Sequence, residues 1–246
     1  MSAHTRNRTA WILAAAALAL AATSPVLAAA EVAEAPRSLF DFFLAGGKLM
    51  WVILGCSLVG LAVVVERVMN LRRSRVVDDK LYDEIIQLVT DAGPERARAR
   101  AQESRLPMSR VLSAVLRCAN APEAEMGTML EDAGARELWD LRRNAKPLGV
   151  ITGVAPLLGL LGTVLGIIRA FSDVATQETA IGNPKLLATG IYEALITTAA
   201  GLTVAIPALL FYHYFQDKAD ALVRDIEEKA LGMIAAIVKR RSPREA

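Results

Sequence analysis

Long apolar segments alternate along the chain with segments in which acidic and basic residues are mixed. The second apolar segment contains one charged residue, Arg169, close to its end, and the third contains one acid, Glu193. About 20 consecutive apolar residues are enough for a helix to cross the hydrocarbon core of a bilayer. The pattern therefore predicts an integral membrane protein with three transmembrane helices, at residues 49–67, 148–171 and 187–214.

The polar segments also have helical periodicity. Leu81, Ile85 and Leu88 recur at helical intervals, and Asp78 or Asp79 is placed to cap the helix. The tail is amphipathic in the same way. Strand patterns are nearly absent, so we expect an all-α fold with helical extensions at 68–147 and 215–246.

The first 30 residues have the composition of a secretory signal peptide. Arg6 and Arg8 precede an alanine-rich apolar stretch, and small residues around Ala28 and Ala30 offer a cleavage site. An uncleaved anchor is the alternative, since the stretch is near the length of a short span. Residues 31–48 then contain a short aromatic segment that we expect to lie at the membrane interface on the periplasmic side.

Lysine and arginine gather on one side of the predicted spans. They crowd both ends of the 68–147 segment and follow the third span, whereas the 172–186 link has only Lys185. The positive-inside rule therefore predicts that the 68–147 loop and the C-terminus are cytoplasmic. The 172–186 link and the N-terminus would lie in the periplasm, which places the protein in a bacterial inner membrane.

Composition excludes several kinds of function. The net charge of +2, with both signs interspersed, gives no basic patch for nucleic acid. No nucleophile–base pair or metal-ligand spacing occurs, and His213 has no ligand-spaced companion. We therefore predict a protein that is not an enzyme and has no cofactor and no bound metal.

The stretch "GLLGTVLG" (159–166) resembles a phosphate-binding loop but lies inside the second span. It lacks the lysine that such a loop needs, and no strand precedes it. Placed on a helix, its glycines and Thr163 share one face. Small residues at this spacing allow neighbouring helices to approach closely. We therefore predict that these residues pack helices: Gly159, Gly162 and Gly166, with Gly201 of the third span and the span prolines Pro156 and Pro207.

The acid of the third span also lies on a small-residue face. Glu193 is one turn from Thr197, with Thr198 at the edge of the face. Because a charge in hydrocarbon costs about 2.5 kcal/mol or more, such a residue usually faces a bundle interior or a hydrated path. We predict a cation pathway lined by Glu193, Thr163, Thr197 and Thr198. Two alternatives stay open: Glu193 lies near the outer boundary and pairs with Arg169 or Lys185, and Thr163 bonds only its own backbone.

Two blocks of sequence, "VAPLLGLLGTVLGIIRAF" and "GIYEALITTAAGLTVAIPALLFYHYF", closely resemble the MotA/TolQ/ExbB proton-channel family, and ExbB proteins in particular. By position, Glu193 matches the glutamate of the family's third span. Thr163 and Thr198 match the threonines that line the pore beside an essential aspartate of the partner subunit. Pro156 and Pro207 match family prolines, whereas Thr197 and His213 differ from the common residues and inherit no role.

The resemblance implies a subunit of a homo-pentameric ring around the helices of an ExbD-like single-span partner. Protons crossing that interface would drive movement that is passed to a TonB-like protein, which energises transport across the outer membrane. A TolQ-like or other proton-driven force generator is the alternative within the class. A non-conducting membrane scaffold is the alternative from a different class.

Overall fold

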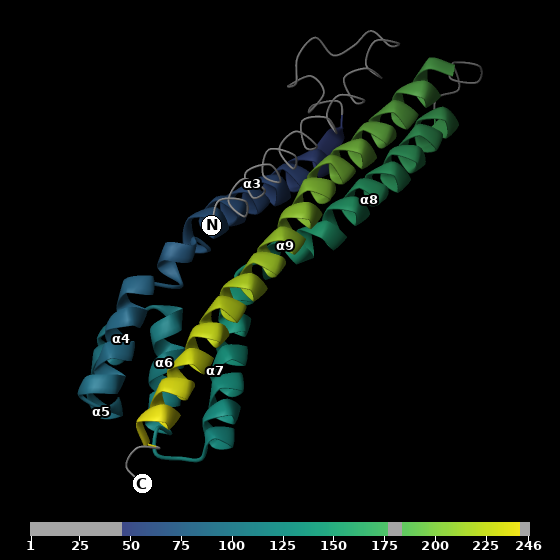
Figure 1. The fold of residues 1–246 in the computed structure, drawn as a ribbon. Helices are drawn as coiled ribbons and strands as arrows, with labels where there is room; N and C mark the ends of the chain where they lie inside the picture. The colour runs from purple at the N-terminus through teal and green to yellow at the C-terminus, as the bar shows by residue number, and fades with distance from the viewer. Residues whose placement is uncertain (1–45, 177–183, 242–246) are drawn as a thin grey trace, which may run out of the picture. The chain divides into compact units, whose positions relative to one another are not determined.

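The computed structural model describes residues 46–176 and 184–241, and within them all regular structure is helical (Figure 1). The predicted signal peptide, nearly all of the interfacial segment 31–48 and the centre of the 172–186 link lie outside the described residues. Three of the helices are long and apolar enough to cross a membrane: α3 (Gly47–Asn70), α8 (Lys146–Thr176) and α9 (Pro184–Arg241). The predicted fold class is therefore confirmed.

The chain divides into two compact units, which we call the span unit and the polar unit. The span unit takes its described residues from 46–64, 146–176 and 184–212, and the polar unit takes them from 65–145 and 213–241. α3 and α9 contribute to both units.

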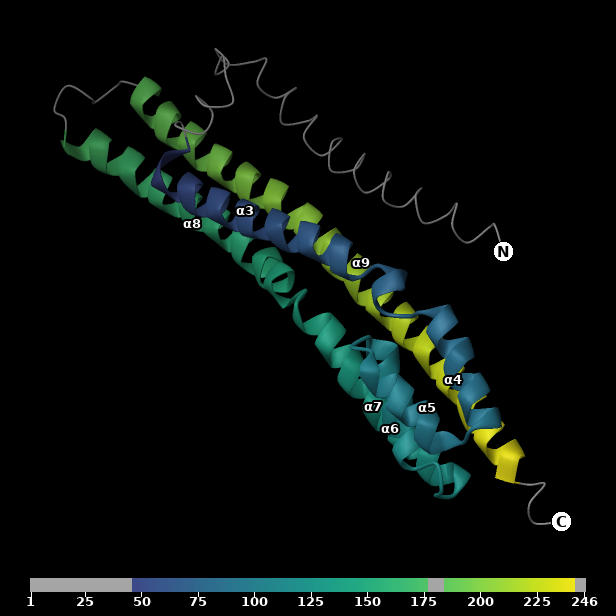
Figure 2. The same ribbon diagram turned by 90° about the vertical axis from the view of Figure 1, so that its left-hand side faces the viewer.

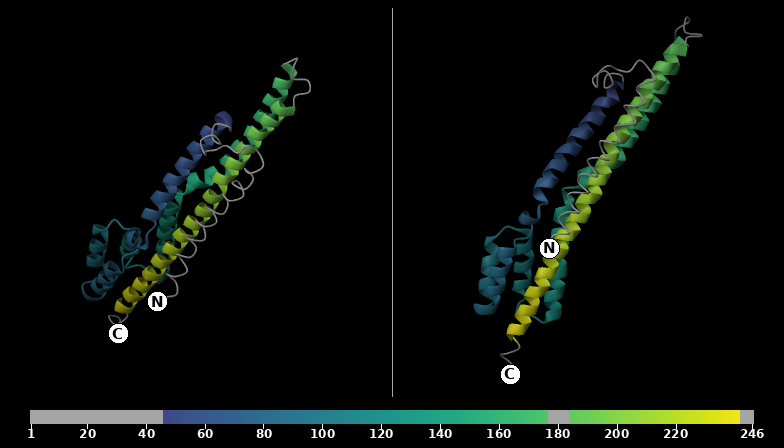
Figure 3. Two further views of the ribbon diagram at one scale, coloured as in Figure 1. Left: turned by 90° about the horizontal axis from the view of Figure 1, so that it is seen from above. Right: turned by 45° about the horizontal axis from the view of Figure 1, so that its top comes forward.

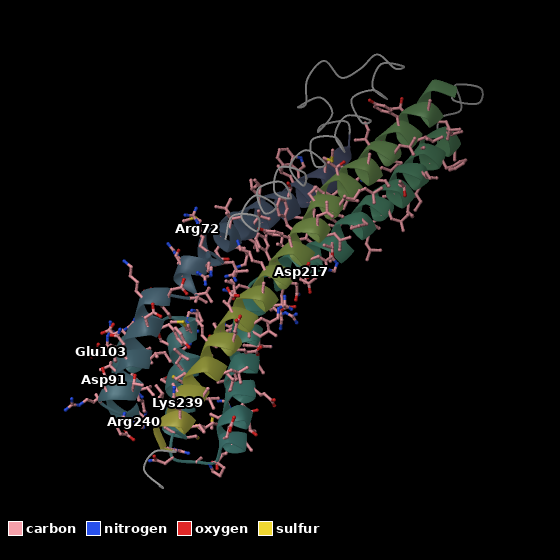
Figure 4. All side chains as sticks on the ribbon, in the orientation of Figure 1. Arg72, Asp91, Glu103, Asp217, Lys239 and Arg240 are labelled. Carbon is pink, nitrogen blue, oxygen red and sulfur yellow. The ribbon has the colours of Figure 1, made fainter. Side chains whose placement is uncertain are left out.

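In the span unit α8 and α9 run side by side, as every view shows (Figures 1, 2 and 3). Many large apolar side chains of the unit are exposed, for example Leu157, Leu195 and Phe171. Exposed apolar surface on this scale suits helices that lipid or other spans surround. Figure 4 accordingly shows few nitrogen and oxygen atoms on the side chains of these helices.

The polar unit is a helical bundle with its own apolar core. It consists of the short 3-10 helix η2 (Arg73–Arg75) and the helices α4 (Asp79–Asp91), α5 (Pro94–Glu103), α6 (Pro107–Arg117) and α7 (Glu123–Arg143), together with the last part of α9. Asp78 caps α4 by accepting from the backbone N–H groups of Lys80 and Leu81. α9 contributes the buried residues Ala219, Leu222, Val223, Ile226, Ala230, Met233, Ile234 and Ile237, which recur at helical spacing.

Arginines of the last turn of α9 bind backbone carbonyl groups of the polar unit. Arg240, labelled in Figure 4, donates to the carbonyl of Val89 near the end of α4. Arg241 donates to the carbonyl of Ala121, 2.7 Å away, in the turn before α7. The carbonyl of Val89 is in the last turn of α4, where carbonyls have no partner within their own helix, so a cationic donor stabilises it.

Candidate functional site

A seam of small residues joins α8 and α9 within the span unit. A Cβ atom added to Gly201 would lie 2.6 Å from the carbonyl oxygen of Ala155 and 3.2 Å from Cα of Gly159. A Cβ atom added to Gly159 would lie 3.0 Å from Cα of Thr198. The two backbones are therefore too close for side chains at these positions.

The same seam continues along α8 toward the link. Gly162 lies directly against the side chain of Thr197. A Cβ atom on Gly166 would be 3.0 Å from Cβ of Ala194 and 3.2 Å from the carbonyl oxygen of Gly190. The structure thus brings the four glycines singled out from the sequence into one contact between two helices of the same chain.

Each of the two proline residues lies in the interior of a long helix. Pro156 is in α8 and Pro207 is in α9, and both are half-buried. Proline lacks the N–H that would bond the carbonyl one turn earlier, so each leaves a gap in the helical hydrogen bonds. Neither helix ends there.

Threonine hydroxyls in the seam bond to backbone carbonyls. Thr198 donates across the seam to the carbonyl of Gly159 at 2.9 Å, which joins α9 to α8. Thr163 donates to the carbonyl of Leu160 in its own helix at 2.6 Å. Thr163 therefore makes a hydrogen bond to the backbone of its own helix, as one of the two alternatives from the sequence expected. Thr198 makes a hydrogen bond from α9 to α8.

Thr197 is the most enclosed of these threonines, with 1% of its surface exposed. Its hydroxyl lies 2.8 Å from the carbonyl oxygen of Glu193 and 3.2 Å from that of Gly46. It therefore connects α9 to the residue that precedes α3. Thr197 inherits no role from the family resemblance, yet its hydroxyl contacts Gly46, directly before the start of α3.

Glu193 lies at the same end of the span unit as Gly46. One of its carboxylate oxygens is 3.4 Å from a guanidinium nitrogen of Arg169, at the far end of α8. The same oxygen occupies the place that a side chain of Gly47 would take. The pairing with Arg169, raised from the sequence as one of two alternatives, is present in this structure.

Gly46 and Gly47 are site residues that the sequence analysis did not identify. Gly47 has a φ of +68°, a conformation that glycine adopts without strain. The signal was present in the sequence as a pair of glycines directly before the first span. Its meaning depends on Glu193, more than 140 positions later in the chain, which only the fold brings close.

The described residues contain no group of three or more histidine, cysteine, aspartate or glutamate side chains that could hold a metal ion. Cys56 and Cys118 are both free thiols. The chemistry of the site therefore rests on one carboxylate, one guanidinium and three hydroxyl groups.

The fold and the site together define a class: a multi-pass, all-helical membrane protein with one acid on a tightly packed pair of spans. The chain belongs to the MotA/TolQ/ExbB proton channel family, whose model matches residues 103–228. The family consists of channels rather than enzymes. The resemblance noted in the sequence is thereby confirmed.

Named relatives support the ExbB type. The chain is 35% identical over 173 residues to the "Putative biopolymer transport protein ExbB-like 3" of Synechocystis, covering 70% of this chain and 82% of the relative. It is 31% identical to "Biopolymer transport protein exbB1" of Vibrio cholerae, covering 66% and 72%. It is also 38% identical to "Tol-Pal system protein TolQ" of Haemophilus influenzae, but over only 43% and 47%.

Proposed function

We propose that this chain is the ring-forming subunit of an ExbB–ExbD-type complex that uses the proton-motive force to power TonB-dependent transport across the outer membrane. In this proposal a homo-pentamer surrounds the span of an ExbD-like subunit. Proton flow between ring and partner drives a movement that a TonB-like protein receives.

The observation that carries the proposal is the lone carboxylate of Glu193 on the small-residue pair α8–α9. An acid in a membrane span is costly unless it has a function or a partner. Here it is half-buried at the junction of three spans, beside the hydroxyl-rich face of Thr197 and Thr198. Small residues and hydroxyls on this face supply the polar lining that a proton path needs.

All three threonine hydroxyl groups make hydrogen bonds to backbone carbonyls, which a pore-lining role has to accommodate. Thr163 and Thr198 donate to backbone carbonyls, which leaves the lone pairs of each hydroxyl oxygen available to accept from a proton donor. We propose that they act as acceptors toward a carboxyl group on the ExbD-like partner. In this proposal Glu193 is the ionisable group that this chain contributes to the proton path.

We further propose that the chain is placed in the inner membrane with its C-terminus in the cytoplasm and its N-terminus in the periplasm, after removal of residues 1–30. The support is the distribution of lysine and arginine, which concentrate in the polar unit. The spans would be 49–67, 148–171 and 187–214, and the polar unit would lie in the cytoplasm.

A TolQ-like role is the second candidate, favoured by the local similarity to the Haemophilus influenzae protein. The two roles differ in the protein that receives the force. A TonB-like protein in the purified complex supports transport, whereas a TolA-like protein supports maintenance of the cell envelope.

The proposal is tested by the variants Glu193→Gln and Thr198→Val in a strain that lacks the native copy. Both are expected to abolish uptake through TonB-dependent receptors, because each removes a group of the proposed proton path. The ring and its ExbD-like partner should still co-purify in normal amounts, with the partners identified by mass spectrometry.

Thr203→Val is the matched control. Thr203 is also on α9 and donates to a backbone carbonyl, that of Ala199, but has no place in the proposed path. Its uptake should equal that of the wild type. Normal uptake in Glu193→Gln at normal expression would instead favour a non-conducting scaffold.

A further inference from the structure

The ion pair between Arg169 and Glu193 crosses from α8 to α9 near the ends that the link joins. The guanidinium nitrogen lies 3.4 Å from the carboxylate oxygen, and the two side chains are 54% and 30% exposed. The pair therefore lies at the edge of the span unit, where an exposed ion pair is worth little for stability. Its geometry suggests a positioning role instead.

The carboxylate is held on a second side by the backbone of α3. Its oxygen lies over Gly47, where any side chain would displace it. Gly47 begins α3, and the N-terminus of a helix carries a partial positive charge. The carboxylate thus lies between a guanidinium and the positive end of a helix.

A third contact fixes the backbone that carries Glu193. Thr197, one turn further along α9, has its hydroxyl within hydrogen-bond distance of the carbonyls of both Glu193 and Gly46. The start of α3 is therefore in contact with α9 through the hydroxyl of Thr197 and the carboxylate of Glu193. Arg169 is the residue that adds α8 to this junction.

We infer that Arg169 is a positioning residue for Glu193, and that it holds the carboxylate over Gly47 at the start of α3. The inference builds on the proposed function, because it concerns the residue placed in the proton path. The inference adds a resting position for the Glu193 side chain, between Arg169 and Gly47. The side chain has to leave this position before it can exchange a proton with a partner.

The physical reason is the cost of an unpaired charge near hydrocarbon. A cation beside a carboxylate attracts it, and removing the cation removes that attraction. Arg169→Gln keeps a polar side chain of similar length and removes the charge. The carboxylate of Glu193 should then leave Gly47 more readily.

The test is chemical labelling of Glu193 by dicyclohexylcarbodiimide, which reacts with carboxyl groups in membranes that are not held in an ion pair. Labelling is measured by mass spectrometry on the full-length protein in native membranes, relative to the amount of protein. Arg169→Gln is expected to raise the labelling rate roughly two- to fivefold, the size of effect that suits a partly exposed pair. Arg169→Lys, which keeps the charge, should stay closer to the wild type.

Gly47→Ala tests the contact between the carboxylate of Glu193 and the start of α3. The new methyl group would occupy the place of the carboxylate oxygen, so this variant should also raise labelling. Ile168→Gln is the matched control, since Ile168 neighbours Arg169 on α8 and is exposed. It should leave the labelling rate unchanged.

The inference fails if Arg169→Gln labels at the wild-type rate, or if Ile168→Gln raises labelling as much as Arg169→Gln does. Labelling does not depend on transport, so this result stands apart from the test of the proposed function. Higher labelling of Arg169→Gln, with Glu193→Gln active in uptake, would support the positioning and contradict the proton path.

Discussion

The carboxylate of Glu193 on α9 pairs with Arg169 of α8 and lies over Gly47 at the start of α3. Glu193 stands out because it is the only acid in its apolar segment, and its cost in hydrocarbon makes it conspicuous. Its surroundings could not be derived, because they come from three spans. The periodicity of one helix places Thr197 beside Glu193, but nothing in it indicates that Gly46 and Gly47 complete the site.

Asp79 of the polar unit provides a test at the scale of one residue. Hydrogen bonds from Arg73, and then from Lys229, lower the pKa of its carboxyl group from 3.8 to about 2. A carboxyl group with a lowered pKa in the folded state adds stability above its unfolded pKa. That contribution is lost as the pH falls from about 4 to about 2.

We therefore expect Asp79→Asn to melt at a slightly lower temperature than the wild type at pH 7, by at most about 4 °C because the aspartate is half exposed. The difference should disappear as the pH approaches 2. Thermal melts of the purified complex in detergent at several pH values check this.

Asp91→Asn, at the exposed end of the same helix, is the control for removing one negative charge. It should not lower the melting temperature at pH 7. An equal loss in both variants, or a loss in Asp79→Asn that persists at pH 2, would contradict the account of the ion pairs.

At the scale of helices, apolar length predicted the three candidate spans and their order. Helical periodicity put the glycines of 159–166 on one face, but it did not indicate which helix they contact. In the structure they contact α9 of the same chain. The residues after the third span were expected to extend that span as an amphipathic helix, and α9 runs from Pro184 to Arg241.

The seam between α8 and α9 predicts a contrast between two glycines of α8. Gly162 lies against Thr197, whereas no atom of another helix lies within 4 Å of the side-chain position of Gly153. Gly162→Ala should destabilise the protein by about 1–3 kcal/mol, as overpacking does. Gly153→Ala should be neutral or slightly stabilising, because alanine favours the helix.

The measurement is the amount of folded protein that survives a heat step in detergent, followed by size-exclusion chromatography. Equal survival of Gly162→Ala and Gly153→Ala would show that the close approach of α8 and α9 is not needed for the fold. A double variant that also shortens Thr197 to Ser should recover part of the loss.

At the scale of the whole molecule, the length of α9 decides what must project from the membrane. Its 58 residues extend for about 87 Å along the helix, whereas a hydrocarbon core is about 30 Å thick. In the proposed topology the charged, amphipathic C-terminal part of α9 is the part that lies in water.

The proposed orientation predicts which cysteines an impermeant maleimide reaches. In a background that lacks Cys56 and Cys118, Ala175→Cys at the end of α8 should be labelled from the periplasm. Glu123→Cys at the start of α7 should be labelled only after the inner membrane is opened. Both positions are exposed, so access to the reagent depends on the side of the membrane.

The opposite pattern would reverse the orientation and contradict the charge argument. Labelling of both positions from the periplasm would mean that the 148–171 segment does not cross the bilayer. This prediction rests on the distribution of lysine and arginine, together with the signal-like composition of residues 1–30.

The seam of glycine and alanine between α8 and α9 has one more consequence. Residues without rotamers lose no side-chain entropy when they pack, so this contact forms without the conformational cost that leucine or methionine would bring. In the proposed complex, a movement that preserves this contact has to carry α8 and α9 together.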